Sequence, residues 1–110
     1  MAATKEDAQL LVQLAQWGAT MGTNEAVAAL FDDGFDPASA NTQDRHVRVV
    51  LNFGETIGTL VKNNLLDREL VLDWLWVSGL WQRVAAAVER DREKYGEPRL
   101  GENFEALASG

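Results

Sequence analysis

Apolar residues recur along the chain at the three-to-four-residue spacing of amphipathic α-helices. The longest such pattern covers residues 68–95 and has two apolar stripes on opposite sides. One stripe consists of Leu70, Trp74, Val77, Trp81, Val84, Val88 and Tyr95. The other consists of Leu72, Leu75, Trp76, Gly79 and Leu80. Because a helix that is apolar on both sides is normally covered on both sides, we expect the rest of the chain to be built around this segment.

Similar spacing and capping residues predict the other helices. Thr4 and Asp7 resemble a capping box at the start of the first helix, and Gly22 is a typical C-terminal cap. The second helix has an apolar face that includes Leu30 and Phe31. The sequence predicts an all-α antiparallel bundle of four main helices, at about 5–21, 24–33, 42–63 and 68–95, plus a short C-terminal helix at 102–108.

The order of these helices also predicts which of them are neighbours. A short link, residues 63–67, joins the two longest helical patterns. Helices with so short a connection usually pack as antiparallel neighbours. We therefore expect this pair to frame the bundle and the first two helices to cover its open face.

Composition limits the class of protein. With 110 residues, of which 46% are hydrophobic, residues 1–110 are expected to form a single domain. The chain has no cysteine, and its N-terminal residues lack the pattern of a signal peptide. Its longest apolar run, of about twelve residues, is shorter than the roughly twenty that a membrane helix needs. A cytoplasmic protein without membrane insertion is therefore expected.

The charge is strongly acidic, with a formal net value of −7. Residues 1–44 contain one lysine and seven acidic residues. A field of this sign repels the phosphates of nucleic acids. Nucleic acid is therefore not expected as a partner.

Patterns that would indicate catalysis or metal binding are weak. The single histidine, His46, has valines at the positions three and four residues later, so a helical metal site is not predicted. Ser78 lacks the glycine pattern of a nucleophile elbow. Gly54 and Gly58 have no phosphate-loop context and are expected to let another helix approach closely. We expect no catalytic residue, no metal and no cofactor.

Two charged residues on the longest pattern have structural interpretations. Asp73 is an exposed edge residue or a partner for a basic residue of the preceding helix, at Arg45, Arg48 or Lys62. The stem of Arg92 is expected to lie on the core, with its guanidinium bound to the last segment through Glu102, Glu105 or backbone carbonyls.

The two stripes of residues 68–95 lead to the functional hypothesis. The predicted structural core includes Trp74, Val77, Trp81, Ile57 and Val61. The second stripe is a candidate interface, formed by Leu72, Leu75, Trp76, Gly79 and Leu80. A non-enzymatic, self-associating protein-interaction module, most simply a homodimer, is the leading hypothesis. The alternative is a small-molecule binding protein with an apolar pocket near Trp76, since core, interface and pocket all remain open for this residue.

A set of residues in the second half resembles a known family. The set comprises Ile57, Leu60, Val61, Leu66, Asp67, Val71, Trp81, Arg92, Pro98, Phe104, Glu105 and Leu107. In these positions the chain resembles the uncharacterised bacterial domain-of-unknown-function family 4760. The resemblance implies an all-helical domain and brings no functional residues with it.

Overall fold

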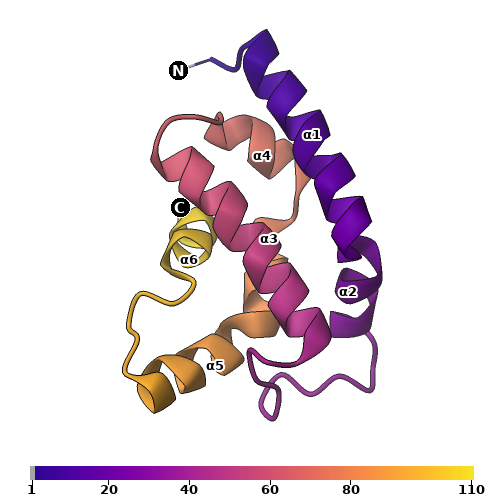
Figure 1. The fold of residues 1–110 in the computed structure, drawn as a ribbon, viewed down its shortest axis with the longest axis vertical. Coiled ribbons are helices and arrows are strands. Elements are labelled where there is room, and N and C mark those ends of the chain that lie inside the picture. Colours follow the sequence, from indigo (N-terminus) through magenta and orange to yellow (C-terminus); the bar gives the residue numbers. More distant parts are fainter. Residues whose placement is uncertain (1) are drawn as a thin grey trace.

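The computed structural model describes residues 2–110, which form six α-helices and no β-strand (Figure 1). The helices are α1 (Lys5–Met21), α2 (Thr23–Leu30), α3 (Arg45–Lys62), α4 (Arg68–Trp74), α5 (Val77–Tyr95) and α6 (Glu102–Ser109). The all-α prediction is therefore confirmed. Within residues 2–110, none of the helices combines the length and the apolarity that crossing a bilayer requires.

The start of α1 has the capping box that the sequence predicts. The amide of Asp7 donates to Oγ1 of Thr4 over 3.2 Å, and the amide of Thr4 donates to Oδ2 of Asp7 over 2.8 Å. The other oxygen of Asp7, Oδ1, accepts from the amide of Asp67 over 3.0 Å. One carboxylate thus caps α1 and also ties its N-terminus to the start of α4.

Helix α3, and not the segment 68–95, is the centre of the fold. It packs mainly against α6 and α2, and it also contacts α5. In Figure 1, α3 (magenta) lies between α1 and α2 on one side and α6 on the other. Its inward residues Val47, Val50 and Ile57 are almost completely buried. The prediction that α3 and the helix after it frame the bundle is therefore wrong. The main neighbours of α3 are α2, from the N-terminal part of the chain, and α6, at its C-terminal end.

The predicted helix 68–95 is in fact two helices. Leu75 has extended backbone angles (φ −122°, ψ 140°), which end α4 before Trp76 leads into α5. A straight helix would direct its apolar stripes to opposite sides, whereas the break lets both parts contribute to one core. Val71 of α4 and Val77 of α5 are both buried. Val77 and Gly79 also have low helix propensity, which favours an interruption here.

Glycines bring α6 against α3, as the sequence predicts. A Cβ atom at Gly54 would lie 2.5 Å from ring carbons of Phe104, and one at Gly58 would overlap the backbone carbonyl of Asn103. The two helices therefore approach more closely than any side chain at these positions would allow. Phe104 is 1% exposed as a result.

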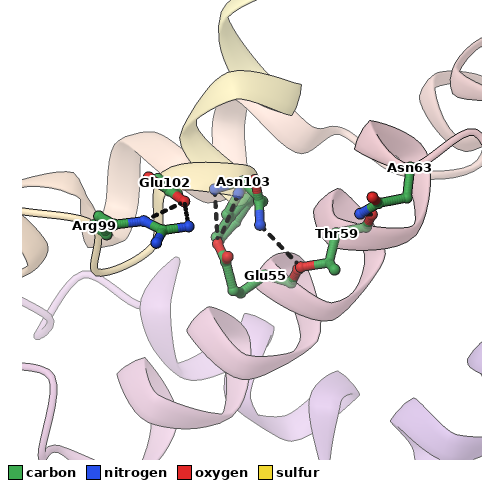
Figure 2. A network of polar contacts seen from close by, with 7 residues as sticks. Glu55, Thr59, Asn63, Arg99, Glu102 and Asn103 are labelled. Carbon is green, nitrogen blue, oxygen red and sulfur yellow. Dashed lines mark hydrogen bonds and ion pairs between the residues drawn. The ribbon is translucent and has the colours of Figure 1, made fainter.

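A carboxylate fixes the start of α6 in this contact (Figure 2). Oε1 of Glu55 accepts from the amides of Asn103 and Phe104 over 3.0 and 2.9 Å. The side-chain amide of Asn103 donates to Oγ1 of Thr59 over 3.0 Å. Because the first amides of a helix have no partner within it, Glu55 of α3 completes the N-terminus of α6.

Candidate functional site

The residues predicted for the structural core do lie in or against it. Ile57 and Val77 are buried, with exposures of 0% and 3%. Trp74, Trp81 and Val61 are partly buried and pack against the buried cluster. All five residues thus belong to the core or to its partly buried margin, and the sequence pattern did not distinguish the two.

The five predicted interface residues do not form one exposed stripe. Gly79 and Leu80 are buried inside the fold, and Leu72 and Leu75 are partly buried against the core. Trp76 is 68% exposed. The helix break explains the difference, because the stripe assumes a straight helix through Leu75 and Trp76. Of the five predicted interface residues, Trp76 is the one whose side chain is largely exposed to solvent.

The ring of Trp76 is held in place on two sides. A Cβ atom at Gly79 would overlap the indole, so the ring lies directly on the first turn of α5. The indole also stacks on Phe31, with ring centroids 5.8 Å apart and an angle of 20° between the planes. Phe31, expected on the inward face of the second helix, instead follows α2 and is 40% exposed. Two exposed aromatic rings from distant segments therefore form one surface.

Arg83 supports this aromatic pair from α5. Its Nε donates to the carbonyl of Leu30 over 2.6 Å, at the C-terminal end of α2. Its guanidinium carbon lies 5.3 Å from the ring centroids of both Phe31 and Phe35. Contacts of a guanidinium with aromatic faces are favourable, so Arg83 fixes the position of Phe31. Sequence spacing gave no signal for this contact, because it joins segments about fifty residues apart.

An open groove of ≈ 550 Å³ lies beside Trp76, between the helix break and the C-terminal end of α6. Its apolar lining includes Leu72, Leu75 and Leu107, and its charged lining consists of Arg68 and Asp73. The guanidinium of Arg68 donates to the carbonyl of Leu107 over 3.1 Å, which joins the two walls. Hence the face of the molecule that carries the exposed indole also carries an apolar depression.

The two charged residues singled out in the sequence lie as follows. Asp73 is exposed, and within residues 2–110 it makes no ion pair with the basic residues considered for it. Arg92 donates to the carbonyl of Leu100 over 2.8 Å and to Oε1 of Glu105 over 3.1 Å. Its guanidinium carbon also lies 5.9 Å from the ring centroid of Trp81. The structural role predicted for Arg92 is confirmed.

A buried carboxylate that the sequence analysis missed lies further along α5. Asp91 is 3% exposed, and its Oδ2 accepts from both the amide and the hydroxyl of Thr42. The hydrogen bond from the hydroxyl lowers the pKa of Asp91 below its usual value, against the opposing effect of burial. Asp91 follows Val84 and Val88 at helical spacing, which was the available signal for an inward position.

Metal-binding groups are dispersed over the fold. Residues 2–110 contain no cluster of three or more His, Cys, Asp or Glu side chains that could hold an ion. His46 is half-buried in the first turn of α3. The absence of a cofactor remains a prediction from the sequence.

Comparison with known families identifies the chain. It belongs to the family described as domain of unknown function (DUF4760), whose model matches residues 2–110. The match covers essentially the whole chain, so restricting the resemblance to the second half was wrong. No curated protein and no solved structure matches the chain.

Proposed function

We propose that this protein is a non-enzymatic interaction module that pairs with a second copy of itself through the surface around Trp76. The observation that carries the proposal is the 68% exposure of this indole in a fixed position. Tryptophan is among the residues that most often dominate the binding energy of protein interfaces. An anchor that is already ordered loses little conformational freedom on binding.

The surroundings of Trp76 favour a second copy over an unrelated partner. The same face carries a projecting aromatic pair, Trp76 with Phe31, and the open groove lined by Leu72 and Leu107. A two-fold interface uses the same surface on both copies, so the projection of each protomer can enter the groove of the other. The groove has one residue of each charge, Arg68 and Asp73. The net negative charge of the chain therefore does not cause repulsion between two copies at this groove.

The geometry of the groove also favours a protein over a small molecule. Small-molecule sites are usually concave and bury most of the ligand, whereas this groove is open along the helix break. The polar groups around it support the fold: Arg68 bonds the carbonyl of Leu107. A protein surface with an aromatic projection covers such a groove better than a compact ligand does.

The proposal is tested by the oligomeric state of the wild type and of Trp76→Ala. Sedimentation equilibrium should show a concentration-dependent dimer for the wild type. Removal of an interface hot spot costs about 2 kcal/mol or more, so Trp76→Ala should raise the dimer dissociation constant about thirtyfold or more.

Tyr95→Ala is the matched control. Tyr95 is 57% exposed and lies at the far end of α5, away from the groove. This variant should dimerise like the wild type. A wild type that remains monomeric at high micromolar concentration would refute self-association, and equal effects of the two substitutions would exclude the Trp76 surface.

A further inference from the structure

The groove beside Trp76 carries two charged side chains of opposite sign. Arg68 begins α4 and Asp73 lies in its last turn, and both line the groove. Arg68 is held by the hydrogen bond from its guanidinium to the carbonyl of Leu107, and its side chain is 33% exposed. Asp73 is exposed and joins no ion pair within residues 2–110. The groove therefore presents a fixed cation and a carboxylate without a counter-ion among the described residues.

The guanidinium of Arg68 keeps donors for a further partner. A guanidinium has five N–H groups, and the bond to Leu107 is made by Nη2. Within residues 2–110, the carboxylate that forms an ion pair with Arg68 is that of Glu69, at 3.9 Å from Nη1. This distance is longer than a hydrogen bond, and the side chain of Glu69 is 83% exposed, so the pair contributes little. Arg68 can therefore still bind a carboxylate from outside the chain.

A two-fold axis brings such charges together between copies. Each contact of a two-fold interface occurs twice, with the roles of the two copies exchanged. A surface with charges of one sign would meet its own sign, whereas a surface with one arginine and one aspartate can pair each with the other. Trp76 follows Asp73 by three residues, and both line the groove. An indole that enters the groove of a second copy therefore brings Asp73 toward Arg68 of that copy.

We propose that Arg68 and Asp73 form two reciprocal ion pairs across the two-fold interface and select a second copy of this chain as the partner. The inference rests on the proposed self-association through Trp76 and adds the contact that fixes its orientation. Complementary charges at an interface contribute to specificity more than to affinity. Trp76 is thus the apolar anchor, and the ion pairs disfavour partners that lack this arrangement of charges.

Exchange of the charges between two variants tests the pairing. Asp73→Arg places two cations in each groove and Arg68→Asp places two anions there, so each homodimer brings like charges together. In sedimentation equilibrium at low salt, each variant alone should show a dimer dissociation constant raised about tenfold or more, because juxtaposed like charges are costly. An equimolar mixture restores both ion pairs in a heterodimer and should associate about as tightly as the wild type. Glu89→Arg changes the net charge as Asp73→Arg does, at an exposed position of α5 outside the groove, and should dimerise like the wild type.

The salt response of Asp73→Arg gives a test that leaves the bond from Arg68 to Leu107 intact. Salt screens charges, so added salt should weaken the wild-type dimer and strengthen that of Asp73→Arg, each relative to Glu89→Arg. These opposite responses decide the matter if circular dichroism shows that Arg68→Asp does not fold.

Two results would overturn the ion pairs while self-association through Trp76 stands. One is a wild-type dimer with a mixture of the folded variants that associates no better than either variant alone. The other is a salt response of the same sign in wild type and Asp73→Arg. A monomeric wild type would instead refute the self-association on which this inference rests.

Discussion

Two regions of the molecule place an aromatic ring directly on a glycine, and they use the contact differently. Phe104 lies on Gly54 of α3 and is 1% exposed. Trp76 lies on Gly79 of α5 and is 68% exposed. The first ring comes from a segment fifty residues away, whereas the second precedes its glycine by three residues. The first contact joins two helices, and the second only orients a ring on the helix that carries it.

The comparison shows that close packing alone does not indicate what a contact contributes. The free energy gained from an apolar side chain depends on how much of it leaves water. Phe104 loses almost all of its exposure, so its contact stabilises the fold. Trp76 keeps most of its exposure, so its contact contributes little to folding and leaves the indole free to bind a partner.

The largest expected difference between the two regions is in the effect of removing each ring. Phe104→Ala should lower the free energy of unfolding by about 3–5 kcal/mol, because it leaves a cavity between α3 and α6. Trp76→Ala removes a larger ring but should cost about 1 kcal/mol or less, as is typical of exposed positions. Urea denaturation of both variants measures the two values. Similar losses would mean that Trp76 is part of the structural core.

Gly58→Ala tests the shape of the α3–α6 contact. The added methyl group would overlap the carbonyl of Asn103, a backbone atom that cannot move without displacing the start of α6. Overpacking of this kind typically costs about 1–3 kcal/mol, so we expect a net loss of about 2 kcal/mol by thermal or chemical denaturation. The exposed position Thr56, on the same helix, supplies a control: Thr56→Ala should change stability little. An unfolding free energy equal to that of the wild type would show that α6 is not held in this position.

Asp91 adds a different kind of contact to the comparison of the two glycine sites. Here a charged carboxylate, and not close packing, holds a distant segment, the one that contains Thr42. Asp91→Asn should lower stability by about 1 kcal/mol near neutral pH, since hydrogen bonds to a charged acceptor exceed those to a neutral one. The lowered pKa of Asp91 means that its contribution is fully present above the ordinary pKa of aspartate. The contribution is lost as pH falls through the lower pKa of the folded state.

The difference between wild type and Asp91→Asn should therefore shrink on acidification below about pH 4. Glu89→Gln removes the same charge from an exposed position of α5 and serves as control. A difference that is constant from neutral to acidic pH would contradict the role of ionised Asp91. So would an equal effect of Glu89→Gln.

The sequence predicted those features that depend on local spacing. The capping box at Thr4, the bounds of α1 and the close approach at Gly54 and Gly58 follow from residues a few positions apart. The position of Arg92 followed from its place on the helical stripe. In each case the residues that determine the feature lie on one helix, or on one face of it.

The break at Leu75 and Trp76 could not be predicted in the same way. Helical spacing continues through it, from Trp74 to Val77 and Trp81, so the pattern is compatible with one helix or with two. What separates the two cases is burial of Val71 and Val77 in a common core, and this depends on where α3 lies. The exposed Trp76–Phe31 pair depends on the break. The sequence pattern therefore grouped Trp76 with the other residues of its stripe and not with Phe31.

Gly79→Ala should give the smallest change in stability. It should also separate the effect on folding from the effect on self-association most clearly. The added methyl group overlaps the indole of Trp76, but this ring is exposed and can swing away without moving backbone. The roughly 1 kcal/mol gained from replacing a helical glycine by alanine offsets the loss of the ring contact, so stability should change by less than about 0.5 kcal/mol. The displaced indole should lose its stacking on Phe31.

Self-association should then weaken nearly as much as in Trp76→Ala, as measured by sedimentation equilibrium. If Gly79→Ala lowers stability as much as Gly58→Ala does, the two glycine contacts are equivalent and the distinction between them fails.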